Sequence, residues 1–313
     1  MTAAFQRALV TGGAGFIGQH LTRALLGRGI AVTVLDDLSV GRLENVPAGA
    51  RFVRGDVRDA AALDDALDGA DCVFHQAALV SVRASLDRFV EDADVNLMGT
   101  LALLRAMARA RVRSAILASS MAVYADRPRH EPVAESAATV PISPYGVAKL
   151  AAERYWLLLA RAAGISATVL RYFNTYGPGQ TFTPYVGVVT IFVNRLLSGE
   201  APIIYGDGEQ CRDYVHVEDV VAANLLALDR GADGRIFNVG TGRGTTVNAI
   251  AAQLIARLAP EMEPLREPAP PGEVRNSIAD IAVIRRELGF EPSRSELDYD
   301  GVIAWWRSVT DRR

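Results

Sequence analysis

Cysteine is scarce in this chain of 313 residues. Only Cys72 and Cys211 are present, which excludes a disulfide framework and a metal site built on cysteine ligands. The four histidines show no spacing typical of metal ligands, so the sequence predicts no metal centre.

An excess of charge of either sign is also missing. The chain has 33 Lys and Arg against 36 Asp and Glu, a formal net charge of −3, which gives no electrostatic basis for binding nucleic acid or an anionic membrane. No uncharged apolar run is long enough to span a membrane, and the segment Met1 to Arg7 lacks the apolar core of a signal peptide. We therefore expect a cytoplasmic protein that binds neither nucleic acid nor membranes.

Short apolar runs alternate with helix-like stretches in the first half of the chain. The predicted strands are 8–11, 31–35, 51–54, 71–75, 114–119 and 167–172. Helices are predicted at about 16–28 and 96–110, where apolar residues recur at helical spacing. This alternation predicts an α/β fold with a parallel sheet covered by helices on both faces.

From Asn174 onward the composition of the sequence changes. Proline and glycine punctuate shorter elements there, and the proline-rich segment 263–272 is predicted to be a loop. We assign residues 1–175 to the sheet domain and residues 176–313 mainly to a second, smaller lobe. Residues 235–240 are predicted to contain a strand that returns to the first sheet.

A glycine-rich turn, TGGAGFIG at 11–18, lies between the first predicted strand and the first predicted helix. In such a turn Gly12, Gly15 and Gly18 permit a tight bend, close approach to a pyrophosphate, and close packing of helix on strand. Asp36 ends the second strand, where a carboxylate bonds ribose hydroxyls and repels a 2′-phosphate. The pattern favours NAD over NADP; the alternative is that Asp36 only begins a turn.

Tyr145 and Lys149 are four residues apart in a predicted helix that begins at Ser143 and Pro144. This spacing places both side chains on one face of the helix. A neighbouring ammonium group lowers the pKa of a phenol toward the range in which it can act as a base. The alternative is a surface tyrosine, with Lys149 paired to Glu153.

Together these motifs resemble those of the extended short-chain dehydrogenase/reductases, and within them the NAD-dependent nucleotide-sugar epimerases and dehydratases. The resemblance spans nearly the whole chain and includes GDVRD at 55–59, SSMAVY at 119–124, RYFN at 171–174 and GDGEQCRDY at 206–214. It implies a Rossmann-type domain that holds NAD tightly and a smaller C-terminal α/β lobe that binds a nucleoside diphosphate.

The resemblance also assigns residues to the cofactor site. Asp56 and Val57 follow the third strand and are expected at the adenine edge, and Ala77 and Ala78 follow the fourth strand, where small residues let the backbone approach the cofactor. The residues expected to contact NAD are Gly12, Gly15, Phe16, Ile17, Gly18, Asp36, Asp56, Val57, Ala77, Ala78, Asn96, Tyr145 and Lys149.

Ser120 matches the catalytic serine or threonine of the family; its neighbour Ser119 is the alternative. Related dehydratases carry Asp and Glu at the next two positions, and related uronate decarboxylases carry a Glu at the second, where this chain has Met121 and Ala122. Eliminating water needs an additional acid and base. The catalytic set Ser120, Tyr145 and Lys149 therefore favours an isomerase, a 4-epimerase of UDP-hexoses that works through a transient 4-keto sugar.

Three alternatives stay open from the sequence. The first is a 4-epimerase of another nucleotide sugar, a UDP-uronate or a dTDP-deoxysugar. The others are a nucleotide-sugar dehydratase or decarboxylase, and an NADP-dependent reductase on the same scaffold.

Residues of the second half are expected to bind the substrate. Asn174 and Arg212 match family residues that contact the diphosphate, and Arg275 is a further candidate because Pro270 stands where the family often has an Arg. Ser277 aligns with the position that gates the sugar 2-substituent, and its small side chain predicts room for an N-acetyl group.

Ser120 and Tyr145 complete the predicted substrate site. Family members commonly form homodimers through the helix that bears the catalytic Tyr and the helix near 96–110. We therefore expect a homodimer.

Overall fold

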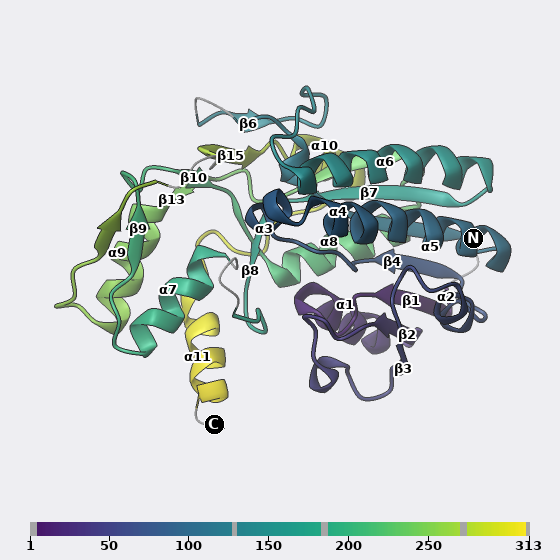
Figure 1. Ribbon diagram of the computed structural model, residues 1–313, viewed down its shortest axis with the longest axis horizontal. Helices are drawn as coiled ribbons and strands as arrows, with labels where there is room; N and C mark the ends of the chain where they lie inside the picture. The colour runs from purple at the N-terminus through teal and green to yellow at the C-terminus, as the bar shows by residue number, and fades with distance from the viewer. Residues whose placement is uncertain (1–4, 127–129, 183–186, 270–273, 311–313) are drawn as a thin grey trace.

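The structure is a computed structural model, and it describes residues 5–126, 130–182, 187–269 and 274–310. A seven-stranded parallel sheet forms its larger part (Figure 1). In order across the sheet the strands are β12 (Arg235–Val239), β7 (Ser166–Tyr172), β5 (Ser114–Ser120), β4 (Cys72–His75), β1 (Arg7–Thr11), β2 (Ala31–Asp36) and β3 (Arg51–Arg54).

The sequence-based prediction of this sheet is confirmed. Each of the six strands expected in the first half is present, and its observed ends lie within one residue of the predicted ends. These runs are apolar because helices cover both faces of the sheet, so almost every strand residue is buried. The result is an α/β fold of the Rossmann type.

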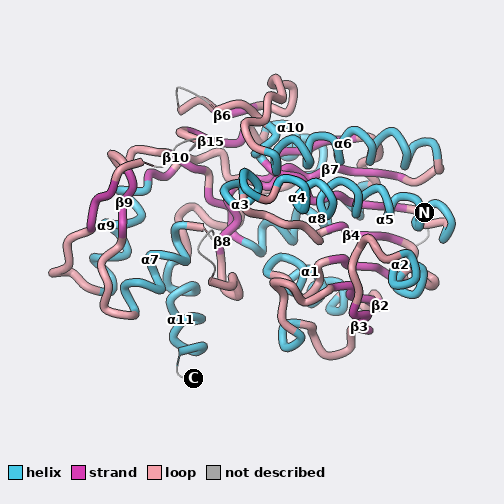
Figure 2. The backbone as a smooth tube through the Cα atoms, in the orientation of Figure 1, coloured by secondary structure: helices cyan, strands magenta, loops and turns pink. Residues whose placement is uncertain are grey.

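Helices pack on both faces of the sheet (Figure 2). One face is covered by α1 (Phe16–Gly27), α8 (Val217–Arg230) and α10 (Ala282–Leu288). The other face is covered by α2 (Ala60–Ala66), α5 (Thr100–Ala110) and α6 (Pro144–Ala162). Ahead of α5 lie α3 (Val82–Asp87), α4 (Phe89–Ala93) and a π-helical turn, η2 (Asp94–Gly99).

The smaller C-terminal lobe has its own apolar core between α7 (Val188–Leu197), α9 (Val247–Leu258) and α11 (Tyr299–Thr310). Three small sheets accompany these helices. They are β13 (Thr245–Thr246), β10 (Cys211–Arg212), β15 (Asn276–Ala279) and β6 (Pro132–Val133); β8 (Asn174–Tyr176) with β11 (Tyr214–His216); and β9 (Ile203–Tyr205) with β14 (Leu265–Glu267).

The prediction of a loop over 263–272 is wrong in its first half. Residues 265–267 form β14, which pairs in parallel with β9, while 270–272 lie outside the described residues. All three residues of β14 are exposed, so the strand is held by backbone hydrogen bonds and carries no apolar alternation that would reveal it. Within the described ranges, no helix is long and apolar enough to cross a membrane.

The order of the strands indicates where on the sheet a ligand binds. The chain leaves β1 toward β2 on one side and reaches β4 on the other side, so the topology of the sheet switches direction between β1 and β4. In open parallel sheets, ligands bind outside the carboxyl ends of the strands at such a switch point.

Candidate active site

The glycine-rich turn lies at this switch point, directly after β1. Gly12 has a φ of +67°, and a Cβ atom there would lie 2.7 Å from the backbone nitrogen of Ala77, which follows β4. A Cβ atom on Gly18 would lie 2.2 Å from the carbonyl oxygen of Gly12. Both positions therefore require glycine, because the turn packs tightly against β4 and against the first turn of α1.

The N-terminus of α1 opens at this turn. Gly15 is the N-cap and supplies no side-chain cap, and the first intrahelical bond runs from Gln19 N–H to the Gly15 carbonyl. The N–H groups of Phe16, Ile17 and Gly18 precede that bond and point toward the end of the helix. A helix end with free N–H groups is a site for phosphate, as a dinucleotide requires.

Asp36 ends β2 beside this turn and is 8% exposed. Its carboxylate accepts hydrogen bonds from the backbone N–H groups of Ala14 (3.0 Å) and Leu38 (2.9 Å). Burial raises the pKa of Asp36, while the two backbone hydrogen bonds oppose that shift. The carboxylate is therefore fixed next to the phosphate site, at the position that bonds ribose hydroxyls in dinucleotide-binding folds.

The other predicted cofactor residues follow β3 and β4. Asp56 accepts hydrogen bonds from the Arg58 backbone N–H (2.8 Å) and side-chain Nε (2.9 Å), and the Arg58 guanidinium lowers the pKa of Asp56. Val57 is buried. The Ala77 N–H donates to Thr11 Oγ1 at 3.3 Å, and Ala78 continues the same loop.

Asn96 is 1% exposed and fixes the loop after β4. Its Oδ1 accepts the Leu79 N–H at 3.1 Å, and its Nδ2 donates to the Leu79 carbonyl at 2.9 Å and to Asp92 Oδ1 at 3.0 Å. These bonds occupy both N–H groups of the amide. Its side chain therefore holds the backbone that follows Ala77 and Ala78.

Tyr145 lies in the first turn of α6, where the sequence predicted a helix start. Ser143 caps the helix by accepting the Gly146 N–H at 3.1 Å, and Pro144 occupies the first turn. Tyr145 is 7% exposed, and the Ser120 hydroxyl hydrogen-bonds its side chain. The structure thus brings the end of β5 and the start of α6 together at one phenol.

The two neighbouring serines of β5 have different partners. Ser120 hydrogen-bonds Tyr145 and accepts the Ala122 N–H at 3.1 Å. Ser119 is buried on the other side of the strand, and its hydroxyl donates to Glu153 at 2.5 Å. Only Ser120 is therefore in contact with the predicted catalytic pair.

Lys149 is 3% exposed and lies one turn below Tyr145, with its Nζ 5.9 Å from the centre of the Tyr145 ring. Nζ donates to the Ala118 carbonyl at 3.0 Å. Burial lowers the pKa of Lys149 to about 8, although Asp92 and Glu153 oppose the shift. The surface pair of Lys149 with Glu153 is not formed, because both side chains are buried and Glu153 pairs with Arg171.

Burial also raises the pKa of Tyr145 to about 12, against the lowering effect of the Ser120 hydrogen bond. The negative charge of Asp92 adds to the increase. The structure therefore does not show the lowering of this pKa by the Lys149 ammonium that the spacing predicted, and the phenol is protonated at neutral pH. A cationic group bound beside the ring would lower this pKa, since an opposite charge favours the phenolate.

Three of the predicted substrate residues lie together in the C-terminal lobe. Arg212 of β10 pairs in register with Ser277 of β15, and Asn174 Nδ2 donates to Ser277 Oγ at 3.4 Å. The Arg212 guanidinium donates to the backbone carbonyls of Val274 and Arg275.

Asp213 is fully buried and accepts from the backbone N–H groups of Thr241, Gly242 and Ala279. Arg275 is separated from this group, because its guanidinium donates to both carboxylate oxygens of Asp207 at 2.9 and 2.6 Å. This contact lowers the pKa of Asp207 to about 2. Pro270 lies outside the described residues.

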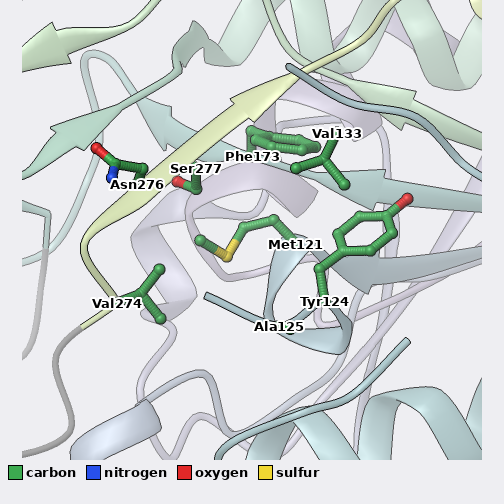
Figure 3. Close-up of a pocket in the computed structure, with 8 residues that line it drawn as sticks. All are labelled: Met121, Tyr124, Ala125, Val133, Phe173, Val274, Asn276 and Ser277. Atoms are coloured by element: carbon green, nitrogen blue, oxygen red, sulfur yellow. The ribbon is translucent and has the colours of Figure 1, made fainter. Parts of the chain in front are cut away.

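A small pocket adjoins Ser277 and was not anticipated from the sequence (Figure 3). Ser277 from β15, Phe173 after β7 and Met121 after Ser120 face the same space. The remaining lining residues are Tyr124, Ala125, Val133, Val274 and Asn276. Met121 follows Ser120, the predicted catalytic serine, and lines the same pocket as Ser277, the predicted sugar-gating residue; only the fold reveals this, since the two are far apart in sequence.

The chain was compared with known proteins. A model of the NAD dependent epimerase/dehydratase family matches residues 8–240. A Methanocaldococcus jannaschii protein named putative UDP-glucose 4-epimerase is 38% identical over 286 residues, which cover 91% of this chain and 92% of that protein.

Solved structures of similar proteins superpose over nearly the whole chain. UDP-glucose 4-epimerase from Thermotoga maritima, solved with UDP-glucose, has a TM-score of 0.93 at 40% identity and covers 97% of this chain and 100% of its own. The Thermus thermophilus UDP-glucose 4-epimerase in complex with NAD has a TM-score of 0.90 at 36% identity, with coverages of 96% and 99%. The chain belongs to the NAD dependent epimerase/dehydratase family.

Proposed function

We propose that the protein is an NAD-dependent 4-epimerase of UDP-hexoses, which interconverts the gluco and galacto configurations through a 4-keto sugar. The observation that carries the proposal is the contact of Ser120 with Tyr145 beside the buried Lys149. The next two residues, Met121 and Ala122, offer no further acid or base. A dehydratase would need such groups to eliminate water, whereas a 4-epimerase needs one reversible proton transfer and one reversible hydride transfer.

The chain's own residues account for the proton transfer. Tyr145 Oη removes the proton of the sugar 4-hydroxyl, and the Ser120 hydroxyl orients that oxygen. To Lys149, whose Nζ lies 5.9 Å from the ring centre, we assign the positive charge that would favour the phenolate when substrate and cofactor are bound. NAD, held by the glycine turn and Asp36, would supply the reversible hydride exchange at C4 of the sugar. Because the proton and the hydride that are removed from the sugar are both returned to it, the reaction consumes no cofactor.

The residues fit NAD as this cofactor. The glycine turn leaves the N-terminus of α1 open for the pyrophosphate, and Asp36 is fixed where it can bond a ribose diol. A buried carboxylate at that position would repel the 2′-phosphate of NADP. We expect Asp56 and Val57 at the adenine edge.

We assign the UDP diphosphate to Arg212 and Asn174, which both lie beside Ser277: Arg212 is its register partner and Asn174 donates to its hydroxyl. Ser277 beside them is small, so we expect the site to accept N-acetylhexosamine forms as well. Arg275 is engaged with Asp207 and would have to change partner to reach a phosphate.

The chain also has surfaces suited to a homodimer. On α6 the side chains of Val147, Tyr155 and Leu158 are 53, 44 and 65% exposed, and Met98 of η2 is 52% exposed. We propose that these helices pack against their copies in a second chain. The two buried free thiols, Cys72 and Cys211, suit the reducing cytoplasm in which we place the protein.

One experiment tests the activity directly. The purified protein is incubated with UDP-glucose, UDP-galactose, UDP-N-acetylglucosamine, a UDP-uronate and dTDP-glucose, and the 4-epimers are resolved by chromatography. We expect interconversion of the UDP-hexoses without added cofactor, and release of NAD when the protein is heated. Turnover that requires added NADPH would identify a reductase and contradict the proposal.

The variant Tyr145→Phe tests the mechanism. It should abolish turnover and leave NAD bound, because it removes the proton acceptor without removing the ring. Tyr155→Phe on the exposed side of the same helix is the matched control and should keep full activity. Full activity of Tyr145→Phe would overturn the mechanism.

A further inference from the structure

Tyr124 lies four residues after Ser120 and is 5% exposed, and the proposed proton transfer does not use it. The residue lines the small pocket that also contains Met121 and Ser277 (Figure 3). The Tyr124 hydroxyl points away from both of these residues. The side chain therefore forms a wall beside the predicted sugar-gating residue, while its hydroxyl is directed into the protein.

The hydroxyl of Tyr124 both accepts and donates a hydrogen bond. It accepts from Arg171 Nη1 at 2.7 Å, because a guanidinium can only donate, and it donates to Asn238 Oδ1 at 2.7 Å. The Arg171 guanidinium also lies over the Tyr124 ring, 4.8 Å from its centre. Both partners are buried, so these bonds are not exchanged with water. One hydroxyl thus ties the segment that follows β5 to β7 and to β12.

Two other walls of the pocket are attached to the same partners. Asn238 Nδ2 donates to the Val133 carbonyl at 2.7 Å, and Val133 lines the pocket. Phe173, which also lines the pocket, follows Arg171 by two residues. The three walls Tyr124, Val133 and Phe173 are therefore held relative to one another through Arg171 and Asn238.

Between Ser120 and Tyr124 the chain forms one short 3₁₀ turn, η3 (Met121–Val123). The turn follows the end of β5, so the pairing of the sheet does not fix it. Its two ends are held locally, because the Ala122 N–H donates to Ser120 Oγ at 3.1 Å and the Tyr124 N–H donates to the Met121 carbonyl at 3.0 Å. The hydroxyl of Ser120 is thus oriented by η3, and Tyr124 anchors the far end of this turn.

The first turn of α6, which carries Tyr145, packs directly on η3. A Cβ atom on Gly146 would lie 2.3 Å from the Ala122 carbonyl oxygen, so the two backbones are in close contact. A shift of η3 would therefore affect both members of the Ser120–Tyr145 contact.

We propose that Tyr124 is a positioning residue of the 4-epimerase, which rests on the proposed function. Its hydroxyl fixes η3 against Arg171 and Asn238, and η3 holds the Ser120 hydroxyl against Tyr145. Tyr124 takes no part in the proton transfer itself. A displacement of about 1 Å at a reacting group is enough to lower a rate by about 10²-fold.

The variant Tyr124→Phe tests the proposal, because it keeps the ring and removes both hydrogen bonds. We expect kcat for UDP-glucose to fall about tenfold or more, since the reacting groups lose their alignment. The Kd of UDP, measured by isothermal titration, and the amount of bound NAD should stay the same. Loss of the chemical step without loss of binding distinguishes positioning from a general weakening of the fold.

Tyr176→Phe is the matched control. Tyr176 is 2% exposed, and its hydroxyl accepts the Asp298 N–H at 2.8 Å in the C-terminal lobe. This variant also removes a hydrogen bond of a buried tyrosine, and it should keep the kcat of the unaltered protein. Activities are compared per mole of NAD-loaded protein, below the unfolding temperature of each variant.

Crystal structures of the unaltered protein and of Tyr124→Phe test the same proposal without an assay. We expect η3 to be displaced in the variant and the hydrogen bond between Ser120 and Tyr145 to be longer or lost. An unaltered protein without epimerase activity would contradict the proposed function alone, and the two structures would still decide whether Tyr124 fixes η3.

Three outcomes would overturn the proposal. They are an unchanged kcat in Tyr124→Phe, an equal fall of kcat in Tyr176→Phe, and the same positions of η3 and Ser120 in the two crystal structures.

Discussion

Glu153 holds Arg171 in a buried two-point ion pair. Its carboxylate accepts from Arg171 Nε at 2.9 Å and from Nη2 at 2.7 Å, and the two side chains are 1 and 2% exposed. The pair joins α6 to β7. Because Glu153 lies one turn beyond Lys149, the pair fixes the face of α6 that carries Lys149 against the sheet.

Removing one partner of this pair should destabilise the fold strongly. Glu153→Gln leaves the Arg171 charge buried without a counter-ion, so we expect the free energy of unfolding to fall by about 3–5 kcal/mol. Urea unfolding measures the change. Asp65→Asn is the control, because Asp65 pairs with Arg51 at 2.6 Å on the surface and should cost about 0–1 kcal/mol. Equal losses in the two variants would contradict the role of burial.

The two serines of β5 should separate catalysis from stability. Ser120→Ala should lower kcat by about 10²–10⁴-fold, the usual contribution of a group that assists proton transfer, since Ser120 contacts Tyr145. Ser119→Ala should keep most activity and lower stability by about 1 kcal/mol, because it loses only the hydrogen bond to Glu153. Epimerase assays and urea unfolding of both variants check this. If Ser119→Ala were the inactive variant, Ser119 and not Ser120 would be the residue that assists proton transfer.

His75 should make the protein sensitive to acid. Its ring is buried between the hydroxyls of Thr11 and Thr100, and burial, with a smaller effect of the Lys149 charge, lowers its pKa to about 3. In the unfolded chain the ring titrates near 6.5. Between these values the unfolded state binds a proton that the folded state does not, so stability falls as the pH drops, by up to about 1.4 kcal/mol per pH unit.

Denaturant unfolding from pH 7 to pH 5 measures this slope. His75→Gln should show a shallower slope than the unaltered protein, because it removes the group that titrates. His130→Gln, a change at an exposed histidine, is the control variant with which the slope of His75→Gln is compared. If His75→Gln has the same slope as the unaltered protein, another group governs the acid sensitivity.

The sheet could be predicted from the sequence because its central strands are apolar runs between turn residues, and burial on both faces produces that pattern. The strand β14 leaves no such mark, since Leu265, Arg266 and Glu267 are all exposed and only backbone bonds hold them to β9. The pattern of apolar residues predicts which strands are buried. It does not predict which exposed segments pair through backbone hydrogen bonds.

The candidate site also has one part that the sequence predicts and another part that only the structure shows. The glycine turn and Tyr145 with Lys149 were predictable, because their chemistry depends on local spacing. The bonds of Asn96 to Leu79, and the shared pocket of Met121 and Ser277, were not, because they join segments that only the fold brings together. Local motifs therefore predict the candidate catalytic residues, whereas the residues that surround them are identified only from tertiary contacts.

Two glycines of α1 should respond in opposite directions. Gly18→Ala places a Cβ atom 2.2 Å from the Gly12 carbonyl oxygen, so we expect loss of NAD binding and of stability. Nothing lies within 4 Å of a Cβ atom on Gly27, at the end of the same helix. Gly27→Ala should therefore stabilise the protein by about 0.5–1 kcal/mol. Thermal unfolding with and without NAD distinguishes the two, and tolerance of Gly18→Ala would refute the close packing.

Ser277 should set the tolerance for the sugar 2-substituent. It is 5% exposed, lines the small pocket with Met121 and Phe173, and accepts from Asn174 at 3.4 Å. Ser277→Tyr fills this space, so turnover of UDP-N-acetylglucosamine should fall about tenfold or more relative to UDP-glucose. Ser277→Ala adds no bulk and should keep the ratio of the two activities.

The ratio is the decisive quantity, because a loss of folding lowers both activities together and leaves it unchanged. If Ser277→Tyr loses both activities, the smaller step Ser277→Val gives the ratio in a folded protein. A ratio that stays the same in Ser277→Val and Ser277→Tyr would place the 2-substituent away from Ser277. Selectivity for the 2-substituent would then depend on residues other than Ser277.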